Sequence, residues 1–202
     1  MTTLRRLSIE RIQQPKYRTI VVDPPWAYND KLGSGNSGFG AKNVSNGADA
    51  KYRTATVADI AKIPVGEWAE DNAHMYLWTT NAFMDEAFDL MRAWDFKQKT
   101  ILTWVKHRED QAWLGMGFYF RNATEHCLFG VRGKLRLART DVSTVFYAPR
   151  GPHSQKPDAF YDLVETCSPE PRIDVFARRK RLSGWDVYGD EVYSDIPLVG
   201  VR

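Results

Sequence analysis

Residues 20–28 read Ile-Val-Val-Asp-Pro-Pro-Trp-Ala-Tyr, an apolar run that ends in a carboxylate, two prolines and two aromatic residues. Such a run is typical of a strand that is buried on both faces of a parallel sheet. Because ligands in open α/β sheets bind beyond the carboxyl ends of strands, the segment also predicts where a site lies. The alternative is an ordinary turn, since Asp and Pro are common in turns and Trp26 would then simply pack.

The rest of the chain alternates apolar, β-branched runs with amphipathic segments. Residues 83–94 carry apolar side chains at helical spacing, and residues 157–167 do the same after an opening proline. This alternation predicts an α/β fold in which helices flank a mixed, mainly parallel sheet. The predicted strands are residues 19–23, 75–79, 100–105, 126–131, 144–147, 172–176 and 185–188.

Length and composition favour a single domain over residues 1–202, with residues 1–18 as an N-terminal extension. The net charge of +3 permits an anionic partner but does not resemble a polycationic tail. Charges near the N-terminus argue against a secretory signal, and no apolar run is long enough to span a membrane, so we expect a cytoplasmic protein. Cys127 and Cys167 cannot build a disulfide framework or a four-cysteine zinc site, and we expect both thiols to be buried.

Residues 30–50 are rich in Gly, Ser and Asn, which predicts a mobile loop next to the end of the first strand. Within it, residues 33–38 match the dinucleotide pattern G-x-G-x-x-G. The match lies well past its strand and opens no helical pattern, so we do not expect it to bind phosphate.

The turn after residue 22 has chemistry that suits a planar group carrying an amine. Proline fixes its own backbone and restricts the residue before it, so the turn should be rigid and present carbonyl oxygens without competing donors. Asp23 adds a carboxylate acceptor, and Trp26 or Tyr28 adds an aromatic face for stacking. The exocyclic amine of adenine or cytosine fits this combination.

The same residues resemble the hallmark of the MT-A70 family of S-adenosylmethionine-dependent adenine-N6 methyltransferases. The resemblance runs collinearly over about residues 19–193. The matching segments are Asp23-Pro-Pro-Trp26, Tyr52-Arg-Thr-Ala-Thr56, Leu77-Trp-Thr79, Trp104-Val-Lys106, residues 121–130, His153-Ser-Gln-Lys-Pro157 and residues 184–190.

The resemblance implies a Rossmann-like class I methyltransferase fold with permuted motif order, in which the catalytic segment precedes the cofactor-binding half. It implies S-adenosyl-L-methionine as the cofactor. We expect no metal, because His126 and Cys127 have no partners at the spacing of zinc ligands. The catalytic residues would be Asp23, Pro24, Pro25 and Trp26. The cofactor would contact Asp23, Lys156, Arg178, Asp190 and Glu191. The nucleic-acid substrate would contact Tyr28, Tyr52, Lys106, Arg121, Asn122 and Glu125.

Several positions depart from the family pattern or have plainer explanations. Residues 178–181 replace the glycines of the usual cofactor turn with a basic run, which is either a nucleic-acid contact or a solvated surface. Asp190 stands where the family commonly has Asn. Lys156 could be a solvated loop charge, Glu125 a carboxylate at a strand edge, and Tyr52 an ordinary loop aromatic.

The favoured function is methylation of the N6 amine of adenine in nucleic acid, with DNA favoured over RNA because the chain lacks room for the extensions of the mRNA enzymes. The alternatives are a catalytically inactive nucleic-acid-binding or scaffold subunit, and a Rossmann protein that binds a small molecule or nucleotide. A homodimer or a partner subunit is compatible with the sequence, and no membrane partner is expected.

Overall fold

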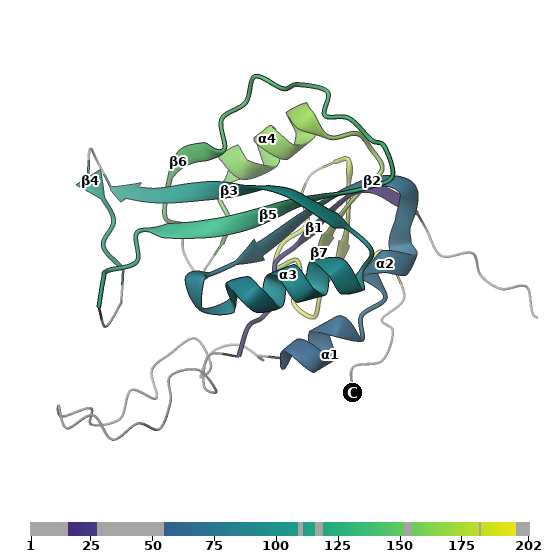
Figure 1. Cartoon of the computed structure of the whole chain (residues 1–202), viewed down its shortest axis with the longest axis horizontal. Coiled ribbons are helices and arrows are strands. Elements are labelled where there is room, and N and C mark those ends of the chain that lie inside the picture. The colour runs from purple at the N-terminus through teal and green to yellow at the C-terminus, as the bar shows by residue number, and fades with distance from the viewer. Residues whose placement is uncertain are drawn as a thin grey trace, which may run out of the picture.

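The computed structural model describes residues 16–27, 55–108, 111–115, 119–151, 155–181 and 183–196. The strands in these segments join in one eight-stranded sheet (Figure 1). The strands are β1 (Tyr17–Val22), β2 (Ala69–Thr79), β3 (Lys97–Arg108), β4 (Gln111–Ala112), β5 (Thr124–Arg132), β6 (Val145–Pro149), β7 (Arg172–Val175) and β8 (Trp185–Tyr188). The helices are α1 (Val57–Ala61), α2 (Val65–Trp68), α3 (Met84–Ala93) and α4 (Asp158–Cys167), with a 3-10 turn η3 (Asn81–Phe83) before α3.

The strand order is β4-β3-β5-β2-β1-β7-β8, and β6 pairs with β3. β1 is parallel to β2 and β7, β7 is parallel to β8, and β3 is parallel to β6. β5 lies antiparallel between β2 and β3, and β4 is antiparallel to β3. The predicted mixed, mainly parallel sheet flanked by helices is therefore confirmed.

The sheet has an apolar core on each face, and β1 contributes to both. Ile20 and Val22 face the cluster that includes α1, α2 and α3, whereas Val21 faces the cluster that includes α4. This alternation follows from the two-residue repeat of a strand. Figure 1 shows α4 on one side of the sheet and the other three helices on the opposite side.

The two predicted long helices form where their apolar stripes require burial. α3 buries Ala87, Leu90 and Met91 against the sheet and carries acidic residues in its first turn, which favours the helix dipole. α4 follows Pro157 and buries Phe160, Tyr161, Val164 and Cys167. The other cysteine, Cys127, lies within β5, and both thiols are buried and free as predicted. No helix in the described segments is long and apolar enough to cross a membrane.

Candidate active site

The carboxyl end of β1 lies at a point where the strand order reverses. β2 follows β1 on one side of the sheet, whereas the chain returns later through α4 to place β7 on the other side. Asp23 comes directly after β1, and its backbone N–H donates to the carbonyl of Val175 at 3.2 Å, at the end of β7. Such switch points are where ligands bind in open α/β sheets.

Backbone hydrogen bonds hold the Pro-Pro turn at this point, which differs from the sequence expectation. The carbonyl of Pro24 accepts the N–H of Trp26 at 2.9 Å, and the carbonyl of Pro25 accepts the N–H of Ala55 at 2.9 Å. The prediction that these carbonyls lack competing donors is therefore wrong. Each carbonyl oxygen has a second lone pair, so Pro24 still has the capacity to accept one more hydrogen bond.

Trp26 anchors the turn to the core. Its ring is 6% exposed and stacks on Phe83 with centroids 5.1 Å apart and an angle of 14° between the planes. Its indole N–H donates to the carbonyl of Trp78 at 3.3 Å. These contacts give Trp26 a structural function at the turn. Its predicted contact with a base would have to use the small exposed part of the ring and stays a prediction.

Four charged side chains of alternating sign meet at this edge of the sheet. Lys156 Nζ lies 2.9 Å from Asp23 Oδ1 and 3.2 Å from Glu125 Oε2. Glu125 Oε1 in turn accepts from Lys106 Nζ at 2.5 Å. The side chains are 8–20% exposed, with Lys156 the least exposed. We call these four residues the charge chain.

The order of the strands explains why the charge chain can form. Lys106 is near the end of β3, whereas Glu125 is near the start of β5, and the antiparallel pairing brings these two positions to the same edge. Lys156 lies two residues before α4, which covers one face of the sheet (Figure 1), and its ammonium group meets Asp23 at this edge. The indole rings of Trp78 and Trp104 lie 5.0 Å from Lys156 Nζ and 5.2 Å from Lys106 Nζ, so aromatic faces support both ammonium groups.

Burial and neighbouring charges shift the pKa values of Glu125 and Lys156 in opposite directions, and the neighbouring charges have the larger effect. Burial alone would raise the pKa of the Glu125 carboxyl, but Lys156 and Lys106 hold it below its ordinary value. Burial alone would lower the pKa of Lys156, but Asp23 and Glu125 raise it. At neutral pH, Glu125 is a carboxylate and Lys156 an ammonium group.

The residues expected on the cofactor side lie after β7 and β8. The N–H of Ala177 donates to the carbonyl of Tyr188 at 3.0 Å, so the turns that follow the two strands touch. A Cβ atom at Gly189 would stand 2.4 Å from the carbonyl oxygen of Ala177, so this contact requires glycine. Arg178 is half-buried with its Nε 4.0 Å from Glu191 Oε1, and Asp190, which precedes Glu191 in the sequence, is exposed.

The residues expected on the nucleic-acid side are only partly described. Arg121 and Asn122 are exposed, and both contact Gly115. Arg121 Nε donates to the carbonyl of Gly115 at 2.5 Å, and the N–H of Gly115 donates to the backbone carbonyl of Asn122 at 2.8 Å. Tyr28 and Tyr52, and the whole of the predicted loop 30–50, lie outside the described residues.

The structure also reveals a buried acid that was not among the predicted site residues. Asp174, in the middle of β7, is 4% exposed and accepts the Tyr161 hydroxyl at 2.8 Å through Oδ2. Its Oδ1 has no hydrogen-bond partner in the described part of the chain. Burial raises the pKa of Asp174 to about 7, and the nearby charge of Asp23 adds to this effect. An alternating strand pattern does not distinguish such an acid from a surface one.

Among the described residues, no group of three or more His, Cys, Asp or Glu side chains is placed to hold a metal ion. His126 packs beside Thr103, whose hydroxyl lies 3.2 Å from its Nδ1, and burial lowers the pKa of this imidazole.

An α/β sheet with an acidic Pro-Pro turn at its switch point has the architecture of a class I-like methyltransferase. The MT-A70 family model matches residues 17–191. The chain therefore belongs to the MT-A70 family.

Named relatives fall into two groups by coverage. Type II methyltransferase M.MunI of Mycoplasma sp. is 30% identical over 193 residues, which cover 90% of this chain and 80% of that protein. N(6)-adenosine-methyltransferase catalytic subunit METTL3 of Homo sapiens is 25% identical over 185 residues, covering 88% of this chain and 28% of that protein. The putative N(6)-adenosine-methyltransferase MT-A70-like protein of Medicago truncatula is 27% identical over 192 residues, which cover 93% of this chain and 27% of that protein. The chain spans about a quarter of the length of these last two relatives.

Proposed function

We propose that this protein transfers a methyl group from S-adenosyl-L-methionine to the N6 amine of adenine in nucleic acid. The observation that carries the proposal is the Asp23 carboxylate, which Lys156 fixes at the carboxyl end of β1 at the switch point of the sheet. Membership of a family whose named members include N(6)-adenosine-methyltransferases supports the choice of reaction.

The residues around the switch point fit the cofactor by the chemistry of their side chains. A bound S-adenosyl-L-methionine supplies an electrophilic methyl group on a positively charged sulfur. Its carboxylate suits an ammonium or guanidinium group, which Lys156 and Arg178 provide at this edge. Its amine and ribose hydroxyls suit carboxylate acceptors, which Asp190 and Glu191 provide after β8. Asp23 lies next to the site of transfer in this arrangement.

In this proposal Asp23 acts on the amine of the base. The lone pair of an aryl amine is delocalised into the ring, and hydrogen bonds accepted from its protons favour a more tetrahedral, nucleophilic nitrogen. Lys156 holds Oδ1 of Asp23, which orients Oδ2 toward the amine, and the carbonyl of Pro24 would accept the second proton. These fixed acceptors stabilise the positive charge that develops on nitrogen. The leaving group is S-adenosylhomocysteine, and the methylated nitrogen gives up one proton to water after the transfer, so no strong base is needed before attack.

Orientation should supply much of the rate enhancement. Holding a nucleophile and an electrophile in line at roughly 3–3.5 Å is worth about 7–11 kcal/mol for well-placed reactants. The rigid anchoring of the turn by Trp26 and Phe83 serves this purpose, because it leaves Asp23 little freedom to move. In a duplex, the target base must first be flipped out of the stack.

DNA is our favoured polymer. The relative that this chain matches over 80% of its length is named a type II methyltransferase, whereas the N(6)-adenosine-methyltransferases are matched over 23–28% of theirs. We therefore propose DNA as the substrate and keep RNA as the second candidate.

The test is transfer of labelled methyl from S-adenosyl-L-methionine to unmethylated DNA and RNA, each single- and double-stranded, at low salt, with nucleoside analysis of the product. We expect N6-methyladenine in DNA, and we expect Asp23→Asn and Asp23→Ala to abolish it. Asp89→Asn is the matched control, because Asp89 is an exposed carboxylate on α3 whose partner is Arg92. Full activity of Asp23→Ala would refute the catalytic proposal. Cofactor binding without product in any polymer would favour an inactive subunit that supports a catalytic partner.

A further inference from the structure

The connection from β7 to β8 is unusual for two parallel strands. Parallel neighbours need a crossover that returns the chain to the starting edge, and this crossover is usually a helix. Residues 176–184 make the return here, and none of those described is helical. The described part of the crossover therefore lacks the internal hydrogen bonds of a helix, and its apolar packing comes from Phe176 and Ala177 at its start.

The crossover also begins with a conformation that favours glycine. Phe176 has a φ angle of +64°, in the left-handed region. A glycine adopts this region at no steric cost, whereas a residue with a Cβ atom does so only when its surroundings hold it there. The turn that would face the cofactor is thus built without the backbone freedom of a glycine-rich loop.

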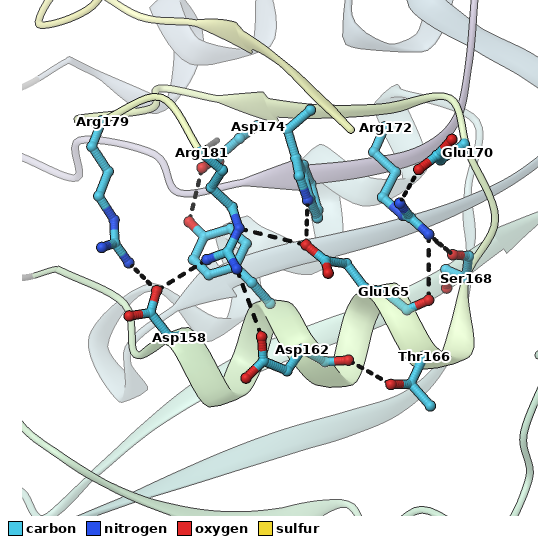
Figure 2. Close-up of polar contacts among 12 residues, drawn as sticks. Asp158, Asp162, Glu165, Thr166, Ser168, Glu170, Arg172, Asp174, Arg179 and Arg181 are labelled. Atoms are coloured by element: carbon cyan, nitrogen blue, oxygen red, sulfur yellow. Dashed lines mark hydrogen bonds and ion pairs between the residues drawn. The ribbon is translucent and has the colours of Figure 1, made fainter. Parts of the chain in front are cut away.

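The basic run supplies the missing contacts through Arg181 (Figure 2). Its guanidinium group reaches three carboxylates along α4, with Asp158 at 3.0 Å, Asp162 at 3.6 Å and Glu165 at 3.5 Å. It also lies 4.6 Å from the ring centroid of Tyr161, and only 19% of its side chain is exposed. We call this set of contacts the arginine clamp.

The neighbours of Arg181 in the basic run are paired as well. Arg179 contacts Asp158 at 2.5 Å, and Lys180 contacts Asp195 at 2.5 Å. Asp195 also accepts the N–H of Val187 in β8 at 2.9 Å, so the run is tied to α4 at one end and to β8 at the other. These charges are engaged within the molecule, which argues against the nucleic-acid contact that the sequence left open.

We propose that Arg181 is a positioning residue for the cofactor. By fastening the crossover to α4, the arginine clamp holds the turn at Phe176 and Arg178 in the shape that receives S-adenosyl-L-methionine. Ion pairs thus replace the glycines that such turns ordinarily use. The inference rests on the proposed function, because it concerns the cofactor side of the same site.

The test compares variants by calorimetric binding of S-adenosylhomocysteine and by steady-state kinetics with DNA. Arg181→Met removes the charge and keeps much of the side-chain length, Arg181→Lys keeps the charge without the planar fork, and Asp158→Asn weakens the clamp from α4. Arg139→Met is the matched control, because Arg139 forms an exposed ion pair with Asp141 elsewhere. Thermal unfolding of each variant establishes that it is folded.

For Arg181→Met we expect a dissociation constant about tenfold higher, equivalent to about 1.4 kcal/mol. Its KM for S-adenosyl-L-methionine should rise by a similar factor, while kcat at saturating cofactor and KM for DNA stay close to wild type. Arg181→Lys and Asp158→Asn should show smaller losses, and Arg139→Met none.

Wild-type affinity for S-adenosylhomocysteine in both Arg181→Met and Asp158→Asn would overturn the clamp and leave the proposed function intact. A rise in KM for DNA with unchanged cofactor affinity would also overturn it, because Arg181 would then be a phosphate contact. Failure of the wild-type protein to bind S-adenosylhomocysteine would instead refute the proposed function itself.

Discussion

Glu125→Gln tests the charge chain most directly, because it removes one charge and changes the shape of the side chain little. In the wild-type protein the carboxylate accepts from Lys106 and lies 3.2 Å from Lys156. A glutamine can face only one of the two lysines with its carbonyl oxygen, so the other lysine meets an amide donor. Lys156 keeps Asp23 as a partner, whereas Lys106 loses the carboxylate.

The expected loss of stability follows from burial. Removing one partner of a fully buried ion pair typically costs about 3–5 kcal/mol. The side chains here are 16–18% exposed, and Lys156 retains one carboxylate, so we expect about 1–3 kcal/mol at pH 7. For a domain of this size that is a fall of roughly 3–10 °C in Tm.

The loss should depend on pH in a defined direction. The folded-state pKa of Glu125 lies below its ordinary value of 4.5, so its ionisation stabilises the fold above that pH. This contribution disappears as the pH falls through the folded-state pKa. The raised pKa of Lys156 keeps that group charged over the same range, so it does not alter the trend.

Urea unfolding of wild type and Glu125→Gln between pH 3 and 8 is the appropriate assay. The difference in unfolding free energy should be largest above pH 5 and should shrink toward acid pH. Asp89→Asn, which removes a carboxylate from an exposed ion pair on α3, should leave the midpoint unchanged at pH 7. Two results would refute the reasoning: equal unfolding free energies of wild type and Glu125→Gln at pH 7, or a difference between them that stays the same from pH 3 to 8.

Three further changes probe other parts of the molecule. Asp174→Asn should have the stability of wild type near pH 4 and be more stable than wild type at pH 8, by at most about 4 kcal/mol. The reason is that Asp174 holds its proton up to about pH 7 in the folded protein, whereas the unfolded chain releases it near pH 3.8. The same difference in urea midpoint at both pH values would contradict this. Gly189→Ala should weaken calorimetric binding of S-adenosylhomocysteine severalfold, because its Cβ would stand 2.4 Å from the Ala177 carbonyl oxygen, and unchanged binding would show that the turn adapts. Phe83→Ala should cost about 3–5 kcal/mol in urea unfolding, because Phe83 is 3% exposed and supports the ring of Trp26, and a loss below 1 kcal/mol would mean that the core closes over the gap.

The sequence predicted the longer helices and strands well, but it did not predict how the strands pair with one another. The strand before Asp23 and the helix of residues 83–94 were found because both depend on local periodicity. Periodicity does not report direction, so the antiparallel insertion of β5 between β2 and β3 was not foreseen. α1 and α2 were missed because four or five residues are too few to show a helical repeat.

The site shows the same limit at the level of side chains. The turn at Asp23 was identified because its residues are adjacent in the sequence. Lys156 and Glu125 were named as site residues through family resemblance, but their contact depends on how α4 and β5 meet at one edge of the sheet. The pairing of Arg181 with α4 was not foreseen, because a basic run looks the same in sequence whether its charges face water or carboxylates.

The central place of β1 has a consequence for synthesis of the chain. β1 is made before the other described strands, yet it pairs with β2 on one side and with β7 on the other, and β7 is made only after β2 to β6. Until residues 172–175 leave the ribosome, one edge of this apolar strand has no partner and can recruit another chain. A message truncated before that point should therefore yield aggregates in place of a partly active protein, because Asp23 is translated before Val175 and Lys156, which surround it in the folded protein.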